Sequence, residues 1–307
     1  MQNIVLLLLS AIALGLGLEV HLRRRAAKQD EPWDTRTLPA PDLQATRLVV
    51  LGDSIAYGQF LAEEQAWPAL LAARLAEALP QRHWQVINAG VPGDATADAY
   101  LRFQAHVAAY RPRLVLIALG LNDCHRTGGS GRADRRLARF RQNEMTRWGR
   151  SHLVRAITAR LASPQRPPPP PAARPRPIVP LDDYKRIMVW LTQQCQRLGS
   201  RPVFLTLTPL APGLQNGGEW GLWADYNQAI RDLGRMVAAP VIEVSHKFTF
   251  AQGWSEDGVH LSAEGQAAVA ERVWQALQRP HLAPLLGDPL NARPGQVSNA
   301  EMAPSLD

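Results

Sequence analysis

The chain has 307 residues, of which 46% are hydrophobic, and nine tryptophans add to a composition that supports a sizeable core and excludes a disordered protein. Two cysteines, Cys124 and Cys195, are too few for a disulfide framework, and no spacing typical of a metal site is present, so we expect no metal and no cofactor. The net charge of +7 is local, because thirteen arginines and two acidic residues between His125 and Pro177 give +11 and leave −4 elsewhere. The basicity therefore does not indicate a nucleic-acid partner, and no nucleic-acid-binding module is recognisable.

The chain begins with an apolar run from Ile4 to Leu18, and three arginines follow it at 23–25. Extended to Leu22, the run approaches the roughly 20 residues of a membrane-spanning helix. No basic residue precedes it and no convincing cleavage site follows, so we expect residues 1–28 to form an uncleaved membrane anchor; a cleaved signal peptide is the alternative. The arginines weakly favour a cytoplasmic location for the rest of the chain, with a periplasmic or extracellular location as the alternative.

Residues 29–46 are polar and contain prolines, which predicts a linker to the folded domain at 47–280. Within that domain, strand-like apolar runs alternate with amphipathic helical stretches. The expected strands are Leu48–Leu51, Gln85–Ile87, Leu114–Leu119, Val203–Leu207 and Val241–Ile242. The expected helices are Glu64–Leu79, Ala95–Tyr110, Asp182–Leu198, Trp223–Val237 and Ser262–Leu277. This alternation predicts an α/β fold in which helices cover both faces of a parallel sheet.

One region interrupts the alternation, and we interpret residues 125–180 as an insertion at the carboxyl end of the third strand. A glycine-rich turn is followed by arginine-rich helical sequence and by five consecutive prolines, which predict polyproline II. Three roles for the insertion remain open: a solvated loop, a cap over the active-site edge, or a contact with anionic lipid headgroups. The tail at 281–307 is expected to be disordered.

Polar residues follow several of the predicted strands at the point where each strand ends. Ser54 follows the first strand, Gly90 the second and Asn122 the third, while Asp257 and His260 lie after the last. Ligands of open parallel sheets bind outside the carboxyl ends of the strands, so these residues are expected to meet at one edge.

Together these residue types supply what acyl transfer needs. A serine becomes a nucleophile when a histidine takes its proton and a carboxylate holds that histidine, which are the roles of Ser54, His260 and Asp257. The backbone N–H groups of Ser54 and Gly90 and the Asn122 amide are three candidate donors to an oxyanion. Asp53 and Asp123 are expected to hold loops rather than to react.

Four segments resemble the conserved blocks of the SGNH/GDSL hydrolase family. They are "GDSIAYG", "NAGVPGDAT", "GLNDC" and "DGVHLSAEG", with Ile55 where the family usually has Leu and Leu261 where many members have Pro. The resemblance covers roughly residues 46–278. It implies a three-layer α/β/α sandwich with a mainly parallel, five-stranded, flavodoxin-like sheet, a Ser54/Asp257/His260 triad, and an oxyanion hole of Ser54, Gly90 and Asn122. The G-x-S-x-G elbow of α/β-hydrolases is absent, which argues against that fold.

The expected function is therefore that of a membrane-anchored serine hydrolase that cleaves carboxylic esters through an acyl-enzyme. The substrate is a lipid acyl ester or an O-acyl group on a glycan, with a slight preference for lipid from the anchor and the basic insertion. The alternative is a non-catalytic scaffold of the same fold that binds a partner or a membrane through the insertion.

Overall fold

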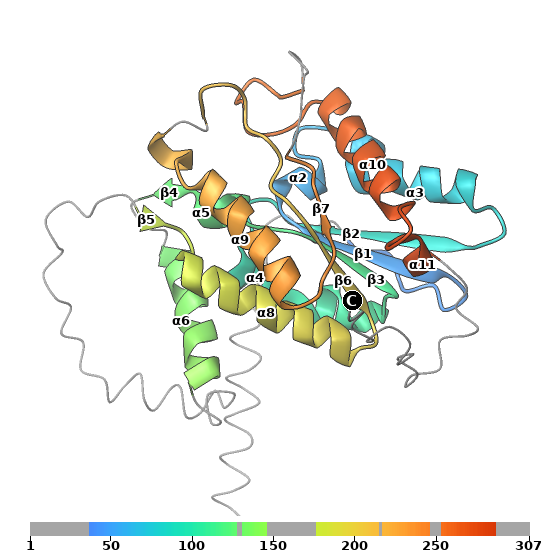
Figure 1. The fold of residues 1–307 in the computed structure, drawn as a ribbon, viewed down its shortest axis with the longest axis horizontal. Helices are drawn as coiled ribbons and strands as arrows, with labels where there is room; N and C mark the ends of the chain where they lie inside the picture. Colours follow the sequence, from blue (N-terminus) through green and yellow to red (C-terminus); the bar gives the residue numbers. More distant parts are fainter. Residues whose placement is uncertain (1–36, 128–130, 146–175, 215–216, 246–252, 287–307) are drawn as a thin grey trace, which may run out of the picture.

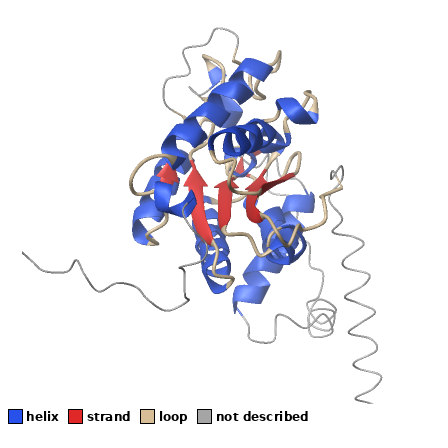
Figure 2. Cartoon of the chain, turned by 90° about the vertical axis from the view of Figure 1, so that its right-hand side faces the viewer, coloured by secondary structure: helices blue, strands red, loops and turns tan. Residues whose placement is uncertain are grey.

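The computed structural model describes residues 37–127, 131–145, 176–214, 217–245 and 253–286. Within them, five strands form one sheet in the order β2-β1-β3-β6-β7, and all neighbouring pairs are parallel. The strands are Thr46–Gly52 (β1), Trp84–Gly90 (β2), Leu114–Ala118 (β3), Arg201–Leu205 (β6) and Val241–Ile242 (β7). Helices cover both faces of the sheet (Figures 1 and 2), which confirms the predicted three-layer α/β/α fold.

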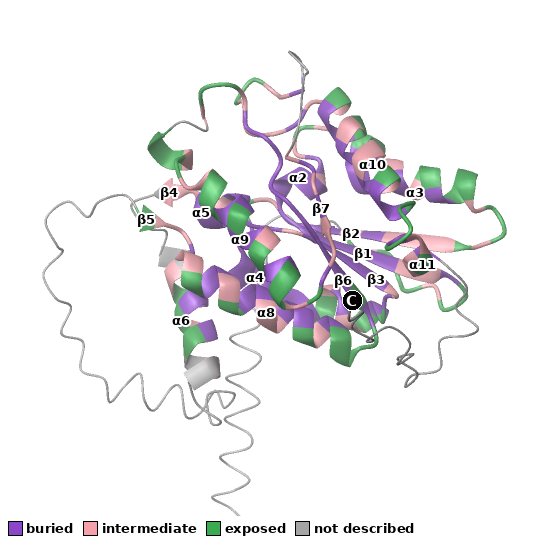
Figure 3. Ribbon diagram, viewed as in Figure 1, coloured by how far each residue is buried: buried purple, intermediate pink, exposed green. Residues whose placement is uncertain are grey.

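Alternate residues of each strand face two separate hydrophobic cores. In β1, Val49 and Leu51 pack into the core formed with one set of helices, while Leu48 and Val50 pack into the other. The first set is α4 (Thr96–His106), α8 (Leu181–Arg197) and α9 (Trp223–Met236); the second is α3 (Trp67–Ala78) and α10 (Ala263–Leu277). Figure 3 shows the strands buried between helices whose outer faces are exposed.

Shorter elements lie at the ends of this framework. The carboxyl edge of the sheet carries two one-turn helices, α2 (Ser54–Tyr57) and α5 (Leu121–Cys124). Single 3₁₀ turns are formed by Glu63–Gln65, Ala108–Tyr110 and Gly218–Trp220. Among the described residues, no helix is both long and apolar enough to cross a membrane. The predicted anchor at 1–28 lies outside the described residues.

At both ends the ordered contacts of the fold extend beyond the predicted domain bounds of 47–280. Residues 37–46 lie against the sheet: the Tyr110 hydroxyl donates to the Pro39 carbonyl at 2.7 Å, and Thr46 already belongs to β1. At the other end, α11 (Ala283–Leu286) follows α10, and Leu282 and Leu286 are buried in the core shared with α3 and α10. These apolar side chains hold the start of the predicted tail in the fold.

The first helix of the insertion is packed against the domain, so the solvated-loop interpretation was wrong for this part. The two ends of the insertion pair as a small antiparallel sheet, β4 (Arg126–Thr127) with β5 (Arg176–Pro177). Helix α6 (Gly131–Met145) packs on α4 and buries Leu137 and Phe140 in the core that contains α4 and α8. The proline-rich part at 146–175 lies outside the described residues.

Candidate active site

The nucleophile candidate lies on a sharp turn from β1 into α2. The Asp53 side chain caps α2 by accepting a hydrogen bond from the Ile55 backbone N–H at 2.9 Å, which leaves Ser54 as the first residue of the helix. The register aligns Gly52 with Gly90 of β2 and with Ala118 of β3, so these three strands end at the same edge. The fold therefore places Ser54 at the carboxyl edge of the sheet, as predicted.

The histidine candidate lies on a short hairpin between β7 and α10. Trp254 and Leu261 form an antiparallel bridge, and the Ser255 N–H donates to the His260 carbonyl at 2.9 Å. Gly258 turns the hairpin with φ +68°, a left-handed conformation that favours glycine. This hairpin directs His260 towards the edge of the sheet where Ser54 lies.

Ser54, His260 and Asp257 form an unbroken hydrogen-bonded series. The Ser54 Oγ lies 2.9 Å from His260 Nε2, and His260 Nδ1 lies 2.5 Å from Asp257 Oδ2. Ser54 and His260 are 206 residues apart, so only the fold brings them together. The structure thus brings the three predicted triad residues together, with His260 between Ser54 and Asp257.

The other carboxylate oxygen of Asp257 accepts hydrogen bonds that stabilise both the hairpin and the ionised form of the side chain. Oδ1 accepts the backbone N–H groups of Val259 and His260 and the Ser255 hydroxyl, each at 2.9 Å. Partial burial raises the pKa of Asp257, but these hydrogen bonds and the one from the imidazole together hold that pKa well below its usual range. An ionised Asp257 requires a proton on Nδ1, which leaves Nε2 free to accept the Ser54 proton.

Two of the three predicted oxyanion donors are available, and the third is engaged. The Ser54 backbone N–H has no acceptor among the described residues, and the Asn122 amide uses only one hydrogen, which it donates to the Asp94 carbonyl at 2.9 Å. The Gly90 N–H instead donates to Asn88 Oδ1 at 3.0 Å. A Cβ at position 90 would lie 2.4 Å from the Tyr57 nitrogen, so close packing against α2 requires this glycine.

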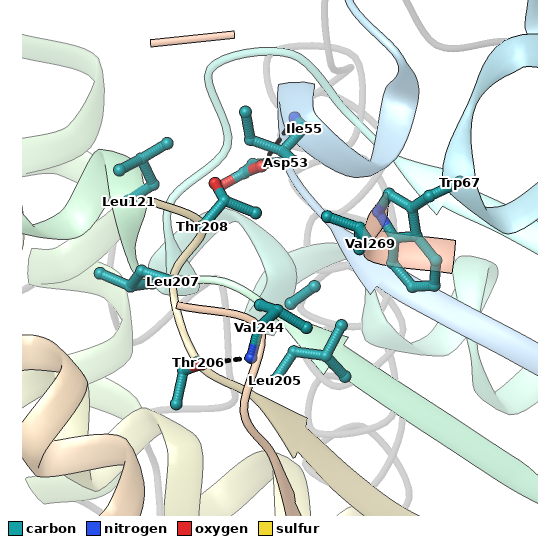
Figure 4. Close-up of a pocket in the computed structure, with 11 residues that line it drawn as sticks. Asp53, Ile55, Trp67, Leu121, Leu205, Thr206, Leu207, Thr208, Val244 and Val269 are labelled. Atoms are coloured by element: carbon teal, nitrogen blue, oxygen red, sulfur yellow. Dashed lines mark hydrogen bonds between the residues drawn. The ribbon is translucent and has the colours of Figure 1, made fainter. Parts of the chain in front are cut away.

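The two aspartates beside the site have the loop-holding contacts expected of them. Asp53 caps α2, and both oxygens of Asp123 accept the Thr96 backbone N–H at 3.0 and 3.1 Å. Both carboxyls are buried, and this desolvation raises the pKa of each to about 7. Asp53 lines a small, mostly apolar cavity of about 20 Å³ together with Ile55, Trp67 and other side chains. Figure 4 shows the side chains that line it.

Three residues that the sequence prediction did not identify join the parts of the site. Gln266 of α10 donates to the Ile55 carbonyl at 3.0 Å and accepts the Trp67 N–H at 2.9 Å, so it ties the helix after His260 to the helix of Ser54. Asn88 donates to the Ala56 carbonyl of α2 at 2.8 Å in addition to binding Gly90. No local sequence signal marks Gln266, because its partners lie about 200 residues away along the chain. Asn88 opens the "NAGVPGDAT" block, but its bond to Ala56 of α2 shows only in the fold.

The third such residue is Phe60, an exposed aromatic side chain beside the base. Its ring lies edge-on to His260, with centroids 5.1 Å apart and planes at 78°. Its backbone has φ +70°, an uncommon conformation for a bulky residue, and its exposed fraction is 68%. The loop thus holds an apolar ring at the solvent side of the serine–histidine pair.

No group of three or more His, Cys, Asp or Glu residues in the described part of the chain is arranged to hold a metal ion. Cys124 and Cys195 are buried thiols without a disulfide, and burial raises the pKa of Cys195 to about 12. Burial also raises the pKa of Cys124 far above its usual range, so this thiol beside Asn122 stays protonated and inert.

Comparison with known proteins agrees with this geometry. The model of the GDSL-like Lipase/Acylhydrolase family matches residues 50–268, and the chain belongs to this family. The esterase TesA of Pseudomonas aeruginosa is 42% identical over 79 residues, which are 26% of this chain and 38% of that protein. An arylesterase of Vibrio mimicus is 38% identical over 89 residues, 28% of this chain and 42% of its own. The matched stretches thus span about two fifths of these relatives.

Solved structures show the same fold at low identity. A TesA crystal structure has a TM-score of 0.52 at 20% identity and covers 78% of this chain and 99% of its own. LAE5, an alpha/beta hydrolase from the metagenome of Lake Arreo, has a TM-score of 0.53 at 17% identity, covering 78% of this chain and 98% of its own. The resemblance that the four sequence blocks predicted is confirmed at the level of family and fold.

Proposed function

We propose that this protein is a serine esterase that hydrolyses carboxylic esters through a covalent acyl-enzyme. The observation that carries the proposal is the continuous contact from Ser54 Oγ through His260 to Asp257, at 2.9 and 2.5 Å. Membership of the GDSL-like family and the esterase names of its relatives support the same reaction class. A scaffold without catalysis would not need this geometry, so the enzyme is favoured over that alternative.

Acylation begins when Ser54 Oγ attacks the ester carbonyl carbon and its proton passes to His260 Nε2. The imidazolium that forms is stabilised by the ionised Asp257, which binds Nδ1–H throughout. The tetrahedral intermediate collapses as Nε2 gives the proton to the leaving alcohol. Water then attacks the carbonyl carbon of the acyl-Ser54 and gives a proton to His260 Nε2. As this second tetrahedral intermediate collapses, the bond to Ser54 Oγ breaks and Nε2 passes the proton to Oγ, which leaves a carboxylic acid and the free serine.

The negative oxygen of the tetrahedral intermediate needs donors that are in place before the reaction. We assign this role to the Ser54 backbone N–H and to the second hydrogen of the Asn122 amide. Gly90, predicted as a third donor, would contribute by sharing its N–H between the oxyanion and Asn88 Oδ1. Removal of one such donor typically costs about 10²–10³ in rate.

The substrate class stays open between a lipid acyl ester and an O-acyl group on a glycan. The cavity beside Asp53 has about 20 Å³, far below the roughly 300–1,000 Å³ of a ligand pocket, so it does not serve as an acyl pocket. The exposed ring of Phe60 offers an apolar surface next to His260 instead. We therefore assign Phe60 to contact with the apolar part of the substrate.

The test is hydrolysis of p-nitrophenyl esters from acetate to palmitate by the purified protein and by Ser54→Ala. Ser54→Ala should lose activity on every ester while its thermal melt stays within about 2 °C. Ser200→Ala is the matched control, because Ser200 binds the Pro112 carbonyl before β6 starts, at the opposite edge of the sheet. Retention of activity in Ser54→Ala would remove Ser54 as the nucleophile.

Membrane attachment through residues 1–28 is a second part of the proposal, and it rests on the apolar run in the sequence. Fractionation of expressing cells, followed by alkaline carbonate extraction, tests it. A protein released by carbonate would not be an integral membrane protein. The accessibility of the folded domain to protease in intact spheroplasts then distinguishes the cytoplasmic side from the outer side.

A further inference from the structure

Helix α4 turns one arginine inwards, towards the carboxyl edge of the sheet. Arg102 is 8% exposed, and its guanidinium has four protein partners. The Nε donates to Asp94 Oδ2 at 2.5 Å, and one terminal nitrogen donates to the Gly52 carbonyl at 2.8 Å. The other terminal nitrogen donates to the Ala89 carbonyl at 2.7 Å and lies 3.2 Å from His106 Nδ1.

Two of these partners lie on segments that carry predicted oxyanion donors, and a third partner binds the residue that supplies the remaining donor. Gly52 lies two residues before Ser54, and Ala89 directly precedes Gly90. Asp94 holds the third donor, because its backbone carbonyl accepts the Asn122 amide at 2.9 Å. One buried side chain thus binds the segments of Ser54 and Gly90 directly and is linked to Asn122 through Asp94.

The geometry of an arginine suits this connection. Its planar guanidinium presents five N–H donors in a fixed fork, whereas a lysine presents a single ammonium whose position is set by a flexible stem. The positive charge is tolerated inside the protein because Asp94, 1% exposed, is paired with it. His106 fits as a neutral acceptor, since burial, and then the nearby Arg102 charge, lower its pKa to about 4.

We propose that Arg102 is a positioning residue for the oxyanion hole: it fixes the relative placement of the Gly52–Ser54 turn and the Ala89–Asp94 segment and, through the Asp94 carbonyl, the placement of the Asn122 amide. This inference rests on the proposed function, and it adds a residue that never touches the substrate. Misplacement of reacting groups by about 1 Å is enough to cost about 10²-fold in rate. Loss of the Arg102 guanidinium is therefore expected to weaken stabilisation of the transition state while substrate binding changes little.

The test compares Arg102→Lys with Arg113→Lys. Arg113 is a half-buried arginine that donates to the Leu285 and Pro284 carbonyls at the opposite edge of the sheet, where β3 begins. In Arg102→Lys, kcat on p-nitrophenyl butyrate should fall about 10- to 100-fold while KM changes less than about threefold. The affinity for butylboronic acid, whose serine adduct resembles the tetrahedral intermediate, should fall by a similar factor. Arg113→Lys should change none of these.

Hydrogen–deuterium exchange provides a readout that does not need activity. Peptides covering 52–58 and 89–96 should exchange faster in Arg102→Lys and at the wild-type rate in Arg113→Lys. If Arg102→Lys does not fold, Asp94→Asn takes its place, because it weakens the hold on the guanidinium and keeps the backbone carbonyl that binds Asn122. Asp94→Asn should also lower kcat with little change in KM and should speed exchange in the same two peptides, but its loss of kcat should be smaller than that of Arg102→Lys.

Each outcome bears on one hypothesis. A lower melting temperature with unchanged kcat and exchange would reduce Arg102 to a structural role and overturn the inference. A rise in KM that matches the loss of kcat/KM would also overturn it, since it would indicate substrate binding. A wild-type protein without Ser54-dependent activity would contradict the proposed function, while exchange at 52–58 and 89–96 would still decide whether Arg102 positions these segments.

Discussion

The buried carboxyl of Asp53 makes the stability of the protein depend on pH in a direction that can be tested. The perturbation is Asp53→Asn, which keeps an oxygen to accept the Ile55 N–H and removes the ionisable group. The side chain lines a cavity with Trp67, Leu121 and Val269, and no cation contacts it in the described structure. Ionisation there is therefore opposed by desolvation.

The magnitude follows from the pKa, which burial raises from 3.8 to about 7. Because the folded protein binds this proton more tightly than the unfolded chain, the stabilising contribution is complete below about pH 4 and is lost as the pH rises to about 7. The difference between these two pKa values corresponds to about 4 kcal/mol in the free energy of unfolding. The asparagine side chain of the variant does not titrate, so Asp53→Asn should gain stability relative to wild type across this window.

Urea unfolding followed by tryptophan fluorescence at pH 4.5, 6 and 8 measures the difference. Asp53→Asn and wild type should differ little at pH 4.5, and the variant should be more stable by about 2–4 kcal/mol at pH 8. Asp225→Asn, which removes an exposed carboxyl from the first turn of α9, controls for the loss of one negative charge. A difference between variant and wild type that stays constant with pH would refute the desolvation argument.

Three further predictions concern the active site and the C-terminal end of the folded domain. Asn122→Ala should lower kcat about 10²–10³-fold with little change in KM, and equal losses through KM alone would contradict the oxyanion role. Phe60→Ala should raise KM for p-nitrophenyl butyrate more than for acetate, because it removes an apolar contact beside His260; an equal effect on both esters would exclude that contact. Leu282→Ala should cost about 2–5 kcal/mol in urea unfolding, whereas Leu43→Ala, at a side chain 81% exposed, should cost little.

The sequence predicted the sheet well because its strands are continuous apolar runs bounded by glycine and polar residues. The predicted order of the five strands and the five helices that cover them holds in the described domain, with ends shifted by a few residues. The one-turn helices α2, α5 and α11 and the short strands β4 and β5 were not predicted. The helix expected from Glu64 starts at Trp67, since Glu63–Gln65 forms a separate 3₁₀ turn and Pro68 favours a helix start. The helix expected to reach Tyr110 ends at His106 for a similar reason, because a 3₁₀ turn follows it.

The sequence predicted those site residues that directly follow strands. It did not predict the helix residues that hold the site in place. Ser54 and Asn122 lie in one-turn helices that directly follow strands, and His260 lies in a hairpin, each within a recognisable motif. Arg102 and Gln266 lie in amphipathic helices, where a polar residue normally indicates the solvent face. Only the folded chain shows that both turn inwards and bind backbone groups of the nucleophile turn.

The arginines of the insertion likewise show that the sequence gives a net charge but does not reveal which charges are paired in the fold. From sequence, a local charge of +11 suggests a surface that attracts anions. In the structure, however, Arg136 of α6 pairs with Asp98 of α4, both nearly buried, and Arg141 of α6 pairs with Asp183 of α8. These pairs use carboxylates from the rest of the chain, whose balance outside the insertion is −4, so part of the basicity docks the insertion on the fold. Only the arginines that remain exposed contribute to a field that a membrane or an anionic substrate would encounter.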